Sequence, residues 1–170
     1  DLGVWLTNKA QSNVVEHNNI SVNGGGVWID RANLNRIEAN EMFGSSGEGV
    51  LLEGANENTI VGNALEENGG GGIKAGLTTS GTAVGLPSDD NVIESNTMFE
   101  NGGSAIEVAG NSSSSITGNS ILGNYARNSN GDGISLDYAR DSIIRGNDVR
   151  QNKGGISLKA SSGNVIEEND

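Results

Sequence analysis

Asn35-Arg36-Ile37-Glu38-Ala39-Asn40 recurs 23 residues later as Asn58-Thr59-Ile60-Val61-Gly62-Asn63, and both segments read Asn-x-Φ-x-x-Asn, where Φ is an apolar residue. Further copies occupy residues 13–18, 91–96 and 164–169, and two copies with Ser in the first position occupy 114–119 and 142–147. The second Asn of the seven copies lies at 18, 40, 63, 96, 119, 147 and 169, so the steps between copies are 22, 23, 33, 23, 28 and 22 residues. A fixed period near 22 residues predicts a solenoid.

The copies continue in a common way. The second Asn is followed by x-Φ-x-x-Asn, then by glycines, and then by a Φ-x-Φ triplet such as Val27-Trp28-Ile29 or Ile134-Ser135-Leu136. The second rung departs from this pattern, because Met42 is followed by Ser45 in place of Asn. Apolar residues that alternate over two to four positions indicate strands, and no window shows the 3.6-residue period of a helix. We therefore expect three short strands per repeat, joined by sharp turns at Asn and Gly, which tolerate positive φ.

Three strands per coil, stacked in parallel, form a parallel β-helix. The repeat predicts an all-β chain of about seven rungs of ~22 residues, roughly 30 Å long at a rung spacing of ~4.8 Å. Apolar side chains should point inward, and the repeated Asn should stack and bond to the next rung. The expected inward residues are Val27, Ile29, Ile37, Ile60, Ile93, Ile106, Ile116, Ile134, Ile144 and Ile166.

These repeats resemble the right-handed parallel β-helix repeats of the pectate-lyase-like superfamily, and the resemblance covers the whole chain. It implies a right-handed, single-stranded coil. The superfamily includes polysaccharide lyases, glycoside hydrolases, epimerases, phage tailspikes and adhesins, so the resemblance alone selects no function. Function has to be argued from a site.

Composition narrows the possible partners. The chain of 170 residues reads as one domain and carries 22 acidic against 10 basic residues, a net charge of −12. Nucleic-acid binding requires a basic surface, so this class is not expected. Anionic polymers are also disfavoured unless a divalent metal bridges the charges. There is no Cys, and no apolar run reaches the 18 residues of a membrane-spanning helix.

Two insertions interrupt the repeat. The step of 33 residues places an insertion at 76–90, and the step of 28 residues places another near 125–131. Solenoids often carry functional residues on such loops, although a tolerated surface insertion gives the same pattern.

The Φ-x-Φ strands also predict two columns of outward residues, each one rung apart. The first column is Trp5, Trp28, Leu51, Lys74, Glu107, Ser135 and Ser157, and the second is Thr7, Asp30, Glu53, Gly76, Ala109, Asp137 and Lys159. Trp5, Trp28 and Leu51 would form an apolar strip suited to sugar rings or to a protein surface. The alternative is that a terminal extension of a longer chain covers this strip.

Asp30 and Glu53 are expected one rung apart in the second column. Two close carboxylates can serve acid–base catalysis or bind Ca²⁺, and the alternative is a solvated acidic edge. Asp89 and Asp90, in the longer insertion, are further candidate Ca²⁺ ligands.

Catalytic signatures of the superfamily are mostly missing. Val27-Trp28-Ile29-Asp30 is similar to a pectate-lyase segment, but Arg31 stands where that family has His. The single His17 precedes Asn18 rather than the Gly of polygalacturonases. We therefore expect a non-catalytic extracellular or cell-surface shaft, adhesin or carbohydrate-binding segment. The alternative is a polysaccharide-active enzyme that uses Asp30 and Glu53.

The ends of the coil predict a second kind of partner. The sequence opens inside a Φ-x-Φ strand, Val4-Trp5-Leu6, and stops at Asp170, two-thirds of the way through a rung. Open ends of a β-helix expose unpaired backbone groups and the apolar bore. The expected cover is a neighbouring β-helix segment of a longer chain, or a second copy stacked head to tail.

Overall fold

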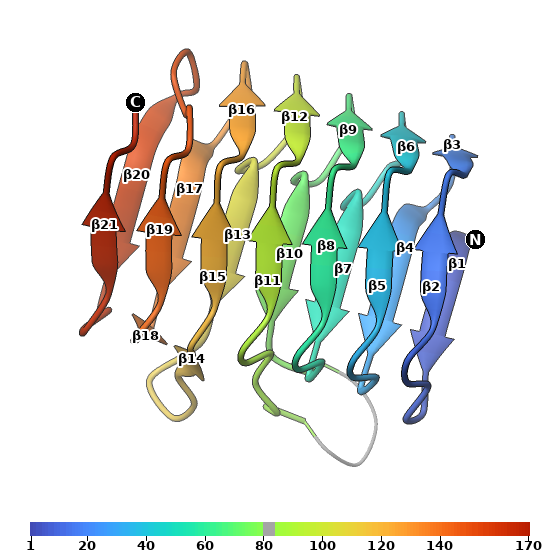
Figure 1. Cartoon of the computed structure of the whole chain (residues 1–170), viewed down its shortest axis with the longest axis horizontal. Helices are drawn as coiled ribbons and strands as arrows, with labels where there is room; N and C mark the ends of the chain where they lie inside the picture. Colours follow the sequence, from blue (N-terminus) through green and yellow to red (C-terminus); the bar gives the residue numbers. More distant parts are fainter. Residues whose placement is uncertain (80–83) are drawn as a thin grey trace.

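The protein is a right-handed parallel β-helix (Figure 1). The computed structural model describes residues 1–79 and 84–170. Residues 80–83, within the predicted insertion at 76–90, lie outside the described residues. The described part contains 21 strands and no helix, so it holds no helical membrane span.

The strands form three long parallel sheets, which run along the three sides of the coil. Sheet A consists of β1 (Leu2–Thr7), β4 (Gly25–Asp30), β7 (Val50–Glu53), β10 (Ile73–Gly76), β13 (Ile106–Ala109), β17 (Asp132–Asp137) and β20 (Gly154–Lys159). Sheet B consists of β2 (Val14–Glu16), β5 (Arg36–Glu38), β8 (Thr59–Val61), β11 (Val92–Glu94), β15 (Ser120–Leu122), β19 (Ile143–Arg145) and β21 (Val165–Glu167). Sheet C consists of β3 (Asn19–Ser21), β6 (Glu41–Phe43), β9 (Ala64–Glu66), β12 (Thr97–Phe99) and β16 (Tyr125–Arg127), and the short pair β14 (Ile116–Thr117) and β18 (Ala139–Arg140) lies at a corner.

The register of sheet A confirms both predicted outward columns. Trp5 pairs with Trp28 and Trp28 with Leu51, and the pairing continues without a slip to Ser157. The residues on either side of these positions point inward and form one continuous apolar core. Nine of the ten expected inward residues are at most 1% exposed. Ile166 is 42% exposed because β21 is the last strand of sheet B and no further strand of this chain covers it.

One repeat was assigned to the wrong register. Strand β15 stacks on β11, so Asn119 aligns with Asn91 and the true copy is 119–124 rather than 114–119. Consequently, the extra residues of this rung lie at 110–118, between β13 and β15. They do not lie near 125–131, where β16 stacks on β12. Asn119 belongs to both matches, but 119–124 has Asn in the first position and 114–119 has Ser, so the sequence pattern already favoured the true copy.

The repeated Asn residues form stacked columns at the corners, as predicted. In the column between sheets B and C, each side-chain amide donates from Nδ2 to Oδ1 of the next rung, at 2.9–3.1 Å, without a break from the first rung to the last. Its members are Asn18, Asn40, Asn63, Asn96, Asn124, Asn147 and Asn169. We call this set the central Asn column.

Asn63 shows how completely one member is bonded. Its Oδ1 accepts the backbone N–H of Asn40 at 2.9 Å and the Nδ2 of Asn40 at 3.1 Å. Its own Nδ2 donates to the carbonyls of Ile37 and Val61 at 2.9 and 3.1 Å and to Asn96 Oδ1 at 3.0 Å. The side chain is only 1% exposed, so these bonds satisfy polar groups that would otherwise be buried without partners.

The sharp turn at this corner is made by the residue before each central Asn, not by the Asn itself. That residue has a left-handed φ in every rung, between 50° and 67°. The seven residues are His17, Ala39, Gly62, Ser95, Gly123, Gly146 and Glu168. A left-handed φ costs a non-glycine residue about 1–2 kcal/mol, so the rungs differ in the strain that they carry here.

Gly62 and Ala39 occupy this position in adjacent rungs and allow the strain to be measured. A Cβ added at Gly62 meets no atom within 4 Å, so Gly62→Ala changes the backbone cost alone. We expect Gly62→Ala to lower the free energy of unfolding by about 1 kcal/mol. Ala39→Gly should raise it by a few tenths of a kcal/mol, because relief of strain is partly offset by the entropy of Gly in the unfolded chain. Urea unfolding of both variants tests this. Stabilisation by Gly62→Ala would contradict it.

Candidate functional site

The predicted apolar strip of Trp5, Trp28 and Leu51 lies on the outer face of sheet A. The two indole rings are stacked, with centroids 5.5 Å apart and planes within 14° of each other. Trp5 is 55% exposed, whereas Trp28 and Leu51 are half-buried. Because the rings cover one face of each other, the surface open to a ligand is the free face of Trp5 and the exposed ring edges.

A hollow of about 220 Å³ adjoins Trp28. Two of its lining residues, Gly24 and Gly25, lie at the corner between sheets C and A and add no side chain to it. A Cβ on Gly24 would lie 2.7 Å from the carbonyl oxygen of Asp1 in the preceding rung. The lining residues are Leu2, Gly24, Gly25, Val27, Trp28, Glu48 and Leu51. The Nε1 of Trp28 is buried and has no hydrogen-bond partner.

Asp30 and Glu53 pair in register one rung apart, as predicted, but the alternative of a solvated acidic edge is wrong. Asp30 is 3% exposed and Glu53 is 5% exposed. The guanidinium of Arg31 donates to both oxygens of Asp30, at 2.7 and 2.6 Å, and Thr7 Oγ1 donates at 3.0 Å. Hydrogen bonding from Arg31 lowers the pKa of Asp30, and this outweighs the opposite effect of burial.

The start of the longer insertion covers Glu53. Thr79 Oγ1 donates to Glu53 Oε1 at 2.8 Å. A Cβ added at Gly54 would lie 2.5 Å from Thr78 and 3.1 Å from Leu86, so the insertion packs directly over this corner. The two carboxylates are therefore held in hydrogen bonds beneath side chains of the same chain. A general acid needs a raised pKa, and Asp30 is shifted in the opposite direction.

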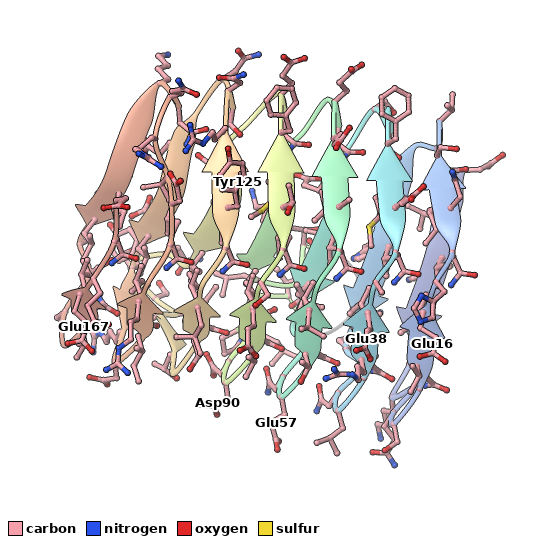
Figure 2. All side chains as sticks on the ribbon, turned by 45° about the horizontal axis from the view of Figure 1, so that its top comes forward. Glu16, Glu38, Glu57, Asp90, Tyr125 and Glu167 are labelled. Carbon is pink, nitrogen blue, oxygen red and sulfur yellow. The ribbon has the colours of Figure 1, made fainter. Side chains whose placement is uncertain are left out.

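Of the second pair of predicted Ca²⁺ ligands, Asp89 and Asp90, one is already engaged in a hydrogen bond within the chain. Asp89 Oδ1 accepts the backbone N–H of Thr117 at 2.7 Å, whereas Asp90 is exposed at the outside of the corner (Figure 2). Among residues 1–79 and 84–170, no group of three or more His, Cys, Asp or Glu side chains could hold a metal ion. The described residues thus offer pairs of carboxylates, and Ca²⁺ binding at Asp30 with Glu53 or at Asp89 with Asp90 stays a prediction.

Both insertions leave the coil at the same corner, between sheets A and B (Figure 1). Ser114 Oγ donates to the carbonyl of Gly85 at 3.0 Å, so the loop of one rung packs against the loop of the rung before it. The sequence analysis did not predict this contact, because it treated residues 114–119 as part of a repeat and placed the second insertion near 125–131.

Sequence reasoning also missed the outer face of sheet C. Alternation around Met42 and Met98, both buried, turns Phe43 and Phe99 outward, and Tyr125 follows in the neighbouring column. Phe43 is 43% exposed and Tyr125 is 41% exposed. Figure 2 shows Tyr125 on the outer side of the coil. The alternation that predicted Trp5 and Trp28 to point outward also predicts these outward aromatic side chains when it is applied to the strands of sheet C.

Comparisons with known proteins agree with the fold. The family model for the right-handed β-helix region matches residues 1–85 and 77–170, which together cover the chain. No curated protein matches it. The ORF18 protein of Geobacillus virus E2 aligns over 94% of this chain with a TM-score of 0.56 and 13% identity, a likeness that shows the fold alone. The chain spans 43% of the length of that protein. HetL, a pentapeptide repeat protein of Nostoc, aligns over 95% of this chain and 87% of its own length at 15% identity, with a TM-score of 0.14.

The Asp30–Arg31 contact makes stability depend on pH. Because the folded pKa of Asp30 lies below its unfolded value of about 3.9, the contact stabilises the fold above pH ~4 and this contribution is lost as the pH falls further. We expect Asp30→Asn to lower the melting temperature at pH 7 and to lower it much less at pH 2.5. In an Arg31→Met background the pH dependence of this difference should shrink. Equal losses at both pH values would contradict the assignment.

Proposed function

The chain belongs to the right-handed β-helix family, and from this premise we propose that it is a non-catalytic extracellular or cell-surface solenoid that binds carbohydrate. The coil would act as a rigid shaft, and the outer face of sheet A would carry the binding surface. The observation that carries the proposal is the exposed indole of Trp5, stacked on Trp28 and continued by Leu51.

The chemistry of this surface suits a sugar. A pyranose ring has an apolar face that packs on an indole, and its hydroxyl groups need hydrogen-bond partners nearby. The hollow beside Trp28 supplies the carboxylate of Glu48, which can accept a hydrogen bond from a sugar hydroxyl.

The negative net charge of the protein disfavours the binding of anionic glycans. With a net charge of −12, the surface repels uronic-acid polymers and sulfated chains. The expected ligands are therefore neutral glycans.

A polysaccharide-active enzyme is the second candidate, favoured by the placement of Asp30 and Glu53 in register on adjacent rungs. Their engagement by Arg31 and Thr79 supports the non-catalytic proposal instead. The choice can be tested directly, because turnover of any glycan that is lost in Asp30→Asn or Glu53→Gln would establish the enzyme.

A neighbouring β-helix segment is the second proposed partner. Leu158 and Ile166 are each 42% exposed on the last rung. Strand edges with apolar neighbours favour the addition of another strand. A further rung of a longer chain, or a second copy stacked head to tail, would bury these side chains.

Tryptophan fluorescence tests the carbohydrate proposal, because the chain has two Trp and both lie in the strip. We expect a neutral glycan from a panel to shift the emission of the full chain. Trp5→Ala should weaken binding about tenfold, since an aromatic stack contributes about 1 kcal/mol or more. Phe43→Ala, which removes an exposed aromatic ring from another face, should leave the affinity unchanged. An unchanged emission spectrum with every neutral glycan, together with equal retention of wild type and Trp5→Ala on glycan columns, would refute the proposal.

A further inference from the structure

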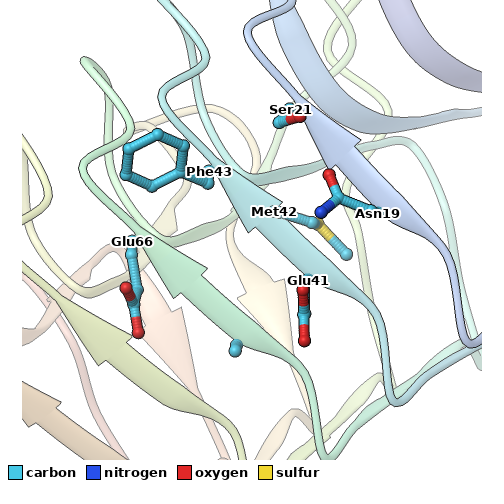
Figure 3. A pocket seen from close by; sticks show the side chains of 7 residues that line it. Asn19, Ser21, Glu41, Met42, Phe43 and Glu66 are labelled. Carbon is cyan, nitrogen blue, oxygen red and sulfur yellow. The ribbon is translucent and has the colours of Figure 1, made fainter.

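A hollow on the outer face of sheet C lies near the N-terminal end of that sheet (Figure 3). Its volume of about 400 Å³ falls within the range of about 300–1,000 Å³ that is typical of small-molecule sites. Its lining residues are Asn19, Ser21, Glu41, Met42, Phe43, Ala64 and Glu66. We call it the sheet C hollow.

Side-chain size in two outward columns creates the sheet C hollow. Glu41 pairs with Ala64 and Phe43 pairs with Glu66, so four side chains form the corners of a square. The single methyl group of Ala64 leaves one corner nearly empty. The other three side chains stand around that space, and the strand backbone at Met42, whose side chain points into the core, forms its floor.

Charge is the second property of the sheet C hollow. Glu41 and Glu66 occupy diagonal corners, and the strand rise and spacing place their Cα atoms roughly 8 Å apart. Both are exposed, and neither forms an ion pair with any residue in the described part of the chain. No Lys or Arg lines the hollow. A cation placed between the two carboxylates would therefore meet no competing positive charge.

An aromatic ring completes the set. Phe43 is 43% exposed and stands beside Glu66, where a cation or an apolar ring can contact its face (Figure 3). Asn19 and Ser21 add an amide and a hydroxyl group on the neighbouring strand, β3. Ca²⁺ requires six to eight oxygen ligands around one point. Two carboxylates at diagonal corners, with an aromatic ring at a third corner, do not provide this shell.

We propose that the sheet C hollow binds a protonated amino sugar. The ammonium group would lie between Glu41 and Glu66, the apolar face of the sugar ring would pack on Phe43, and the sugar hydroxyls would bond to Asn19 and Ser21. A peptide that adds as a strand is the poorer fit, since the two carboxylates and Phe43 lie on β6 and β9, which are paired on both edges and cannot accept an added strand. This site shares no residue with the Trp strip, so it goes beyond the proposed function.

Calorimetry with the full chain tests the proposal with three probes. The glucosamine tetramer carries the ammonium groups, its fully N-acetylated counterpart lacks them, and putrescine carries ammonium groups without a sugar. We expect the glucosamine tetramer to bind the Trp5→Ala variant, in which the Trp strip is disrupted, at least tenfold more tightly than either of the other probes. Equal affinity for the acetylated tetramer would overturn the role of the carboxylates, and equal affinity for putrescine would overturn the role of the sugar ring.

Variants then locate the site. Ala64→Leu fills the sheet C hollow without changing charge, and it should abolish binding of the glucosamine tetramer while the melting temperature stays near that of wild type. Glu41→Gln or Glu66→Gln should weaken binding about tenfold. Glu94→Gln removes an exposed carboxylate from sheet B and is the matched control. A loss in Glu94→Gln equal to that in Glu41→Gln, or full binding by Ala64→Leu, would show that net charge alone attracts the ligand and would overturn the proposal.

The two binding proposals fail separately. Trp5→Ala should leave the affinity for the glucosamine tetramer unchanged. Ala64→Leu should leave the fluorescence response to neutral glycans unchanged. If one of these variants lost both the binding of the glucosamine tetramer and the fluorescence response to neutral glycans, the assignment of two separate sites would be overturned.

Discussion

The structure depends on the side-chain amides of the central Asn column. A rung can turn tightly between sheets B and C only if one residue adopts a left-handed φ, and the next backbone N–H then points along the coil axis rather than to a partner in its own rung. The Oδ1 of the Asn one rung further along accepts this N–H, as Asn63 does for Asn40 at 2.9 Å. Asn suits the position because its amide carries an acceptor and two donors, which also reach two carbonyls and the next Asn. In the column that follows sheet C, Ser45 and Ser129 replace Asn, and the hydroxyl of each is buried without a partner.

Because the corners hold successive rungs in register, outward side chains at equivalent positions form columns that run along the coil. Each sheet strand is only two to six residues long, so one or two outward side chains per rung define each face. A binding surface on such a coil is therefore specified by the residues that follow one another at a spacing of one rung. The Trp strip and the sheet C hollow are two surfaces of this kind, one made by large side chains in succession and the other by a small side chain between large ones.

Repeat spacing predicted the fold and the pairing of sheet A residue by residue, because alternation and period are local properties of the sequence. The burial of an outward side chain depends on which other segment packs over it, and the repeat pattern carries no information on such packing. Asp30 and Glu53 were predicted to point outward, open to a substrate, to Ca²⁺ or to solvent, but Arg31 and Thr79 cover them. The repeat does not predict the path of the insertion that carries Thr79. Residues 114–119 overlap the true copy at 119–124, which has Asn rather than Ser in the first position, and the stacking of Asn119 against Asn91 establishes 119–124. The sheet C hollow depends on the volume of Ala64 beside its neighbours, which becomes apparent only once the register is known.

Hydrogen exchange at the corner between sheets B and C tests the central claim most directly. In a ¹⁵N-labelled sample, NMR can follow the backbone N–H of Asn40 and Asn63 and the Nδ2 protons of Asn63 and Asn96. If the amide column holds the coil together, these protons exchange only on global unfolding, as slowly as the N–H groups at the centre of sheet A. Exchange of these protons at the rate of exposed amides, while sheet A stays protected, would contradict the account.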